Sequence, residues 1–324
     1  MKPRSFRSVS SVLLRAGMLF FREDFVLFSL QLIWHLAFGI WHSVVGKAHT
    51  ERSVVDDLLF SSLLWLRITH SGIEAMSPDS TAPVIEVSNL VAGYGPTTVL
   101  DGVSFDVRPR EVLVILGTSG CGKTTLLRHV IGLRRPTSGS IRLWGREISG
   151  MPEDELDTLR VRFGVAFQSG ALFNSLTAAE NVALPMRERG FDPDLIPALV
   201  RLKLSLVGLA HAGAKMPAEL SGGMRKRVAF ARALALDPEI VFFDEPLAGL
   251  DPVTAAGLDR LILKLRDLLG ITMVVVTHEL ASIRAIADRA LMLADGKVLF
   301  SGPLAEVDRS QDPRVQHFFR REPE

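Results

Sequence analysis

The feature that most constrains the fold of this chain is an apolar run that leads directly into a glycine-rich loop. EVLVILG (111–117) is apolar at nearly every position, which is typical of a strand buried on both faces of a sheet. GTSGCGKTT (117–125) follows with the spacing G-x-x-x-x-G-K-[ST], and LLRHVIGL then repeats its apolar residues at helical intervals. Strand, loop and helix in this order predict a phosphate-binding loop, here residues 117–125.

The loop residues have the chemistry that a nucleoside triphosphate requires. Successive backbone N–H groups of such a loop point inward, and the dipole of the following helix adds a favourable potential for an anion. Lys123 can reach the β- and γ-phosphates, and the Thr124 hydroxyl can ligate Mg²⁺. The predicted nucleotide-binding residues of the loop are Gly117, Thr118, Ser119, Gly120, Cys121, Gly122, Lys123, Thr124 and Thr125. For Cys121, a small space-filling residue and a redox-sensitive thiol are both open.

Three further apolar runs end in polar residues that fit the same chemistry. EIVFFDEP (239–246) predicts a buried strand whose Asp244 holds Mg²⁺ and whose Glu245 orients and deprotonates the attacking water. ITMVVVTHEL (271–280) predicts another strand, and its His278 is expected to approach the γ-phosphate beside Glu245. FGVAFQ (163–168) predicts a strand that ends in Gln168, whose neutral amide can ligate Mg²⁺.

These motifs, together with ELSGGM (219–224), occur in an order and spacing that resemble the ATP-binding cassette of ABC transporters. The resemblance covers residues 84–320. It implies an α/β fold of the P-loop NTPase type: a RecA-like core with a mixed sheet, an antiparallel β portion and a helical subdomain around 170–220. The domain is expected to span 84–324. In LMLADGKVLF, the residues Asp295 and Gly296 predict a tight hairpin turn.

The resemblance also implies an ATPase that works as a dimer, with ATP and Mg²⁺ as its cofactors. In this family the LSGG segment, Ser221, Gly222 and Gly223 here, binds the γ-phosphate of ATP held by a second copy of the chain. LAGLDP (247–252) resembles the D-loop, which places Asp251 at the dimer seam. Tyr94, the only tyrosine, matches the aromatic residue that stacks on adenine.

Longer stretches narrow the resemblance further, to ATPase subunits of MCE-type (mammalian cell entry) lipid transporters. These stretches are 167–188, 221–252 and 312–319, and they include Met224 in place of the usual glutamine. The partners implied are an integral-membrane permease, which contacts the segment after Gln168, and an MCE-type lipid-binding protein. The expected location is the cytoplasmic face of the inner membrane. An ABC transporter for another solute and a non-transport ABC protein are the alternatives. Lys plus Arg (37) nearly balances Asp plus Glu (36), so no global field favours a nucleic acid.

The first 75 residues are rich in apolar side chains. The segment MSPDSTAP (76–83) follows, and its Ser, Pro, Asp and Thr residues predict a linker. FVLFSLQLIWHLAFGIWHSVV (25–45) is long enough to span a bilayer, but one span would separate the cassette from cytoplasmic ATP. Three interpretations stay open: an apolar helix at the membrane interface or against a partner, a translation start at Met76, and a spanning hairpin. A signal peptide is disfavoured because no small-residue cleavage site follows the run. A single cysteine excludes an internal disulfide and fits a reducing cytoplasm.

Overall fold

The structure, a computed structural model, describes residues 82–168 and 171–320. The interpretations of residues 1–75, of most of the linker and of the start site therefore lie outside the described residues. Within the ranges that the structure describes, no helix is both long enough and apolar enough to cross a membrane.

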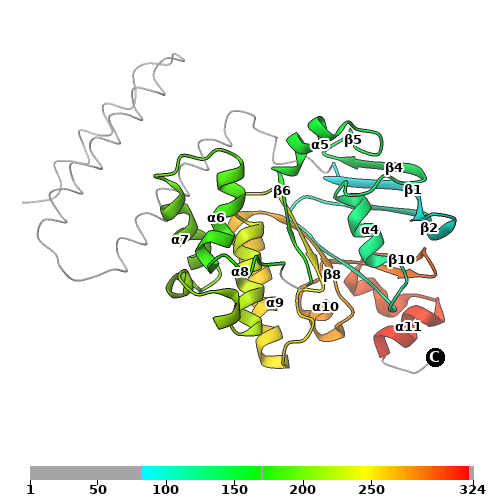
Figure 1. The fold of residues 1–324 in the computed structure, drawn as a ribbon. Helices are drawn as coiled ribbons and strands as arrows, with labels where there is room; N and C mark the ends of the chain where they lie inside the picture. Colours follow the sequence, from blue (N-terminus) through cyan, green and yellow to red (C-terminus); the bar gives the residue numbers. More distant parts are fainter. Residues whose placement is uncertain (1–81, 169–170, 321–324) are drawn as a thin grey trace, which may run out of the picture. The chain divides into compact units, whose positions relative to one another are not determined.

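A six-stranded sheet forms the centre of the fold, with the strand order β10–β9–β3–β8–β7–β6 (Figure 1). Its strands are β3 (Val112–Gly117), β6 (Phe163–Ala166), β7 (Ile240–Asp244), β8 (Thr272–Val276), β9 (Arg289–Ala294) and β10 (Lys297–Pro303). The strands from β9 to β6 pair in parallel, whereas β10 pairs with β9 in the antiparallel sense. Every residue of β3, β7 and β8 is buried, which explains why their sequences are continuous apolar runs.

The hairpin predicted at Asp295 and Gly296 joins β9 to β10. Asp295 has a φ of 49° and Gly296 a φ of 73°, as a two-residue type I′ turn requires at both central positions. Ala294 and Lys297 pair directly on either side of the turn. This part of the fold prediction is confirmed.

A second, antiparallel sheet has the strand order β2–β1–β4–β5. It consists of β1 (Ile85–Tyr94), β2 (Thr97–Val107), β4 (Ser138–Leu143) and β5 (Arg146–Glu147). Strands β1 and β2 are longer than the alternating patterns at 84–90 and 103–107 indicate, because they continue through irregular register shifts to a turn after Tyr94. The local pattern predicts no strand at β4, because SGSIRL is mostly polar; pairing with β1 holds this segment extended.

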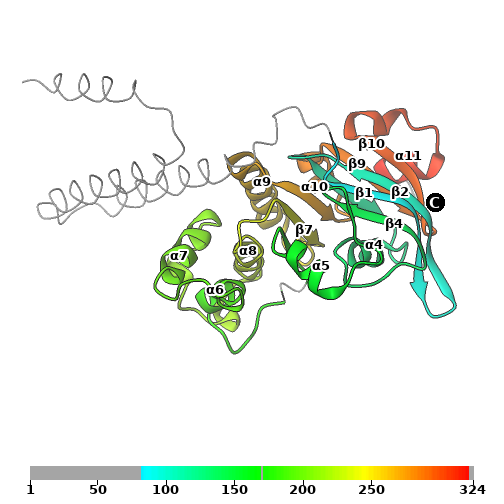
Figure 2. The ribbon, with the colours of Figure 1, turned by 90° about the horizontal axis from the view of Figure 1, so that it is seen from above.

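Helices pack against the central sheet, and some of them extend the domain to one side. They are α4 (Lys123–Val130), α5 (Glu153–Arg160), α6 (Ala178–Glu188), α7 (Ile196–Leu206), α8 (Gly222–Ala233), α9 (Pro252–Leu269), α10 (Leu280–Ile286) and α11 (Pro313–Arg320), with short 3₁₀ turns at Ala210–Ala212, Pro217–Glu219 and Leu304–Arg309. Helices α6 and α7 pack on α8, at the end of the domain away from the antiparallel sheet (Figures 1 and 2). Helix α4 contacts strands of both sheets. The phosphate-binding loop that precedes α4 therefore begins at a junction of both sheets.

A cluster of one cation and two carboxylates, of which Arg289 and Glu111 are buried, links the two sheets. The Arg289 guanidinium at the start of β9 donates to the Glu111 carboxylate at 3.0 Å and to both carboxylate oxygens of Asp106 in β2 at 3.0 Å. The side chains of Arg289 and Glu111 are only 11% and 10% exposed. Burial raises the pKa of Glu111, and the adjacent Arg289 charge counteracts that rise.

We expect the Arg289→Met substitution to lower the free energy of unfolding by about 3–5 kcal/mol, because it leaves the Glu111 carboxylate buried without its cation. The control is Lys297→Met, since Lys297 and Asp101 form an exposed ion pair at 3.1 Å between the same two sheets. That control should cost about 0–1 kcal/mol. Urea denaturation of both ATP-free variants measures the difference, and equal midpoints would show that the Arg289 cluster adds no stability.

Candidate active site

The carboxyl ends of four parallel strands meet at one edge of the central sheet. Because β3, β8, β7 and β6 are neighbours in that order, the residues that follow them lie side by side. A cavity of about 640 Å³ opens there. Its lining includes most of the predicted residues: Gly117, Thr118, Ser119, Gly120, Gly122, Lys123, Thr124, Thr125, Gln168, Glu245 and His278.

The phosphate-binding loop has a backbone that only glycine allows at its first position. Gly117 has a φ of 145°, and a Cβ atom there would lie 2.1 Å from the carbonyl oxygen of Leu293. The Lys123 ammonium donates to the carbonyl oxygens of Gly117 and Thr118, each at 2.9 Å, and so lies within the loop. Among the residues that the structure describes, no side chain caps the N-terminus of α4. Its first N–H groups are therefore available to an anion at the loop.

Thr124 and Asp244 bring two oxygen ligands together from distant parts of the chain. The Thr124 hydroxyl donates to the Asp244 carboxylate at 3.4 Å, across 120 residues of sequence. Burial and the neighbouring Glu245 charge raise the pKa of Asp244. A hydroxyl, two adjacent carboxylates and the Gln168 amide form an all-oxygen set of the kind that Mg²⁺ prefers, and a dication would offset the repulsion between the carboxylates. The residues present thus fit a magnesium ion.

Glu245 and His278 form the second pair at this edge. The Nδ1 atom of His278 lies 2.9 Å from Oε1 of Glu245, although the residues are 33 positions apart. The other carboxylate oxygen, Oε2, is buried and has no hydrogen-bond partner within the described part of the chain. Glu245 has a φ of 47°, which is unusual for a residue with a side chain. One carboxylate oxygen of Glu245 thus faces His278, whereas the other is enclosed.

Of the residues predicted to bind the chain's own nucleotide and magnesium ion, Asp244, Cys121 and Tyr94 do not line this cavity. Asp244 is buried and accepts a hydrogen bond from Thr124, which does line the cavity. The Cys121 sulfur is buried behind the loop, 3.9 Å from the Lys123 Nζ atom, and burial raises the pKa of its thiol. That setting is unlike the low-pKa, exposed thiols that react readily. Tyr94 is 39% exposed; its hydroxyl shares a 3.5 Å hydrogen bond with Thr125, and the Arg134 guanidinium lies 4.4 Å from its ring centroid.

The LSGG segment and the D-loop lie next to each other, outside the cavity. Ser221 is the N-cap of α8, where its hydroxyl accepts from the Met224 N–H at 3.3 Å. Asp251 caps α9 in the same way, accepting from Val253 and Thr254 at 3.1 and 3.0 Å. A Cβ atom on Gly223 would lie 2.6 Å from the Thr254 methyl group. Close packing of α8 on the start of α9 is thus a second reason for a glycine here, besides the predicted phosphate contact.

The structure adds two residues that sequence reasoning missed. Phe318 of α11 lines the cavity, and no local pattern indicated this. Lys226 of α8 is buried, and its ammonium donates to the carbonyl oxygens of Gln168 and Glu245. Burial lowers the pKa of Lys226, while the carboxylates of Glu245 and Asp244 favour its charged form. Helical spacing could have predicted that Lys226 is buried. It lies three residues after Gly223 and four before Phe230, and therefore on the same, buried face of α8.

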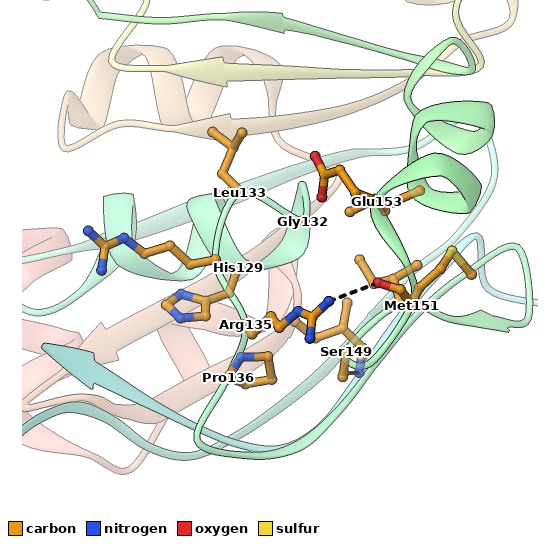
Figure 3. A pocket seen from close by; sticks show the side chains of 12 residues that line it. His129, Gly132, Leu133, Arg135, Pro136, Ser149, Met151 and Glu153 are labelled. Atoms are coloured by element: carbon orange, nitrogen blue, oxygen red, sulfur yellow. Dashed lines mark hydrogen bonds between the residues drawn. The ribbon is translucent and has the colours of Figure 1, made fainter. Parts of the chain in front are cut away.

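A smaller cavity of about 170 Å³ lies at the C-terminal end of α4 (Figure 3). Arg135 donates across it to the Met151 carbonyl at 3.4 Å, and the buried His129 ring contacts the Thr125 carbonyl through Nδ1 at 2.8 Å. None of the predicted site residues lines it. Both its size and its lining therefore favour the larger cavity as the nucleotide site.

Comparisons with known proteins agree with this geometry. Residues 100–248 match the family model described as "ABC transporter". The phospholipid transport ATP-binding protein MlaF of Haemophilus influenzae is 42% identical over 240 residues, which cover 74% of this chain and 91% of that protein. The methionine import ATP-binding protein MetN of Brucella abortus is 40% identical over 235 residues, covering 71% and 62%.

A solved structure completes the comparison. The dimeric, post-hydrolysis state of the ATP-binding cassette MJ0796, bound to ADP and Pi, superposes with a TM-score of 0.63 at 31% identity over 68% of this chain and 98% of that one. The α/β cassette fold, the nucleotide and the ATPase activity expected from the sequence are thereby confirmed. The chain belongs to the ABC transporter family, as an ATP-binding subunit that couples ATP hydrolysis to transport.

Proposed function

We propose that this chain drives lipid transport, as the ATPase of a transporter of the MCE type. The observation that carries the proposal is the match to MlaF, an intermembrane phospholipid transport protein, which extends over 91% of that relative. The match to the methionine importer is nearly as high in identity but covers 62% of that protein. An ATPase for another solute, such as an amino acid, is therefore the second candidate.

We further propose that the cavity holds Mg²⁺–ATP in the following way. The N–H groups of the phosphate-binding loop and Lys123 bind the phosphates, and the exposed Tyr94 ring stacks on adenine. Thr124, Gln168 and Asp244 hold the magnesium ion, directly or through its water shell, and the ion supplies positive charge to the phosphate oxygens. Glu245 takes the proton of the attacking water, and His278 holds the carboxylate in place and contacts the γ-phosphate. Positioning and charge provide nearly all of the catalysis.

The partners that we propose are a second copy of the chain and a membrane permease, at the cytoplasmic face of the membrane. The MJ0796 cassette is a dimer in its own solved structure. Three large apolar side chains are exposed next to α6 among the described residues: Phe173, before the helix, is 52% exposed, and Phe191 and Leu195 follow the helix. The buried Asn181 side chain fixes the Phe173 backbone by accepting from its N–H at 2.8 Å and donating to its carbonyl at 3.1 Å. An exposed aromatic side chain whose own backbone is fixed in this way favours a docking surface for the permease.

Co-purification tests the lipid assignment. The full-length tagged chain is isolated from native membranes in mild detergent, and the associated proteins and lipids are identified by mass spectrometry. We expect a permease, an MCE-type lipid-binding protein and bound phospholipid. Recovery of an amino-acid permease with its binding protein would favour the second candidate, and recovery of ribosomes or DNA would contradict a role in transport.

We expect Lys123→Ala to weaken ATP binding by about 10- to 100-fold, because the variant loses charge-assisted hydrogen bonds to phosphate oxygens. Equilibrium binding of a fluorescent ATP analogue measures the effect. The exposed Lys264 of α9 provides the control, and Lys264→Ala should bind ATP normally. Unchanged affinity in the Lys123 variant would contradict the assignment of the phosphate-binding loop.

A further inference from the structure

Lys226 connects helix α8, which begins at the LSGG segment, to the residues Gln168 and Glu245 at the edge of the cavity. It lies on α8, five residues after Ser221, and only 9% of the residue is exposed. Its Nζ atom donates to the carbonyl oxygen of Gln168 and, at 3.3 Å, to the carbonyl oxygen of Glu245. The segment that is predicted to meet the partner's nucleotide therefore carries a cation bonded to the chain's own catalytic edge.

An ammonium group at this position requires an explanation, because burying a charge is costly unless it is paired. The residues around it on the inner face of α8, such as Ala229 and Phe230, are apolar, so a methionine of similar length would pack there without that cost. The carbonyl oxygens that receive the two hydrogen bonds belong to residues of the proposed hydrolysis site. The carboxylates of Asp244 and Glu245 also lie close enough to favour the positive charge.

The bond to Glu245 holds a residue whose backbone is strained. Glu245 has a φ of 47°, and its N–H donates to the Val276 carbonyl at 2.9 Å. Lys226 binds its carbonyl on the other side of the residue. Strained conformations persist only where the surroundings fix them, and here β8 and α8 do so together. The direction of the Glu245 carboxylate toward His278 thus depends on where α8 lies.

We infer that Lys226 is a positioning residue that couples the two nucleotide sites of the dimer. The inference rests on the proposed role of Ser221 at the partner's nucleotide. Ser221 begins the rigid helix that carries Lys226 about 7.5 Å further along its axis. When the LSGG segment engages the partner's ATP, α8 moves as a unit, and Lys226 transmits that movement to the carbonyls of Gln168 and Glu245. Each site then hydrolyses ATP faster when its partner site is filled.

The test compares Lys226→Met with Lys226→Arg in the full-length chain, purified with its membrane complex. Methionine keeps the length and packing but removes the charge and the donors, whereas arginine keeps both. Lys203→Met is the matched control, because Lys203 is also buried and bonds to Asp237 at 2.7 Å, and it lies on α7 and does not line the cavity. The readouts are kcat, KM for ATP, the Hill coefficient and the melting temperature, with ATP affinity measured separately in a Glu245→Gln background.

We expect Lys226→Met to lower kcat by about 10- to 100-fold, the effect of losing hydrogen bonds to a buried charge, with ATP affinity changed less than about threefold. Its Hill coefficient should fall to about 1, the value for two independent sites. Lys226→Arg should restore most of the rate and the cooperativity, and Lys203→Met should lower only the melting temperature.

Two results would overturn the inference. One is an unchanged kcat and Hill coefficient in Lys226→Met. The other is a fall in kcat and Hill coefficient that equals the fall in Lys203→Met, when the two variants are compared at the same distance below their melting temperatures. A separate Ser221→Arg arm distinguishes this failure from failure of the proposed function. If Ser221→Arg is inactive while Lys226→Met is normal, only the coupling role of Lys226 is wrong. If Ser221→Arg is fully active, the shared-site dimer itself is wrong.

Discussion

The Glu245→Gln chain is expected to bind ATP with normal affinity and to hydrolyse it about 10²- to 10⁴-fold more slowly, the usual contribution of a general base. Glutamine has the same shape as glutamate, so the contact with His278 at 2.9 Å and the backbone bonds to Val276 and Lys226 can persist. What the substitution removes is the ability of the side chain to accept a proton from the attacking water. The ATP-bound dimer should accumulate as a result.

Single-turnover hydrolysis and size-exclusion chromatography with ATP measure these two effects. Glu279→Gln is the matched control, because the Glu279 carboxylate lies 3.8 Å from Nε2 of the same histidine but is half exposed. That control should hydrolyse ATP at nearly the normal rate. Normal turnover in the Glu245→Gln chain would remove Glu245 from the role of base.

The second large effect is expected from Ser221→Arg. If the LSGG segment meets the partner's γ-phosphate, a long side chain at its first contact residue blocks closure of the dimer. We expect the ATPase rate to fall by about 10²- to 10³-fold, as for loss of a donor that stabilises transition-state charge. ATP binding to the variant's own phosphate-binding loop should remain, because Ser221 does not line that cavity.

The Ser221→Arg substitution also removes the N-cap of α8, and this separate effect on stability needs its own control. Ser221 accepts a hydrogen bond from the Met224 N–H, and removing such a cap costs about 1 kcal/mol. Thr177 caps α6 with a reciprocal bond to Glu180, so Thr177→Ala removes a comparable cap elsewhere. That variant should lose similar stability and keep its ATPase rate.

Mixed dimers provide the sharpest version of this test. A dimer of one Ser221→Arg chain and one Lys123→Ala chain contains one site with both defects and one site with neither. Complementary half-sites therefore predict that the mixture regains ATPase activity well above that of either variant alone. If no mixture ever exceeds the separate variants, the two half-sites do not act across the dimer.

Local sequence was sufficient to predict the elements that are expected to bind phosphate. The phosphate-binding loop is a contiguous segment, and its function depends on its own backbone, so GTSGCGKTT after an apolar run predicts both the conformation and the ligand. The same holds for β7 and β8, whose burial on both faces requires continuous apolar sequence. The hairpin at Asp295 and Gly296 follows from turn chemistry alone.

Other features depend on how distant segments meet, and no local pattern contains them. The pairing of Thr124 with Asp244 and of Glu245 with His278 follows from the strand order β3–β8–β7, which places three carboxyl ends at one edge. β4 is a strand because β1 pairs with it, despite its polar sequence.

The sequence by itself determined that this chain binds ATP in a cassette, because the necessary groups lie within short, self-contained motifs. Only the tertiary structure decided that Gly223 must be small, since Thr254 lies against it, and that Lys226 points at Gln168 and Glu245. The physical reason is that a side chain's partner is set by the packing of whole elements, whereas a loop's capacity to hold phosphate is set by its own backbone.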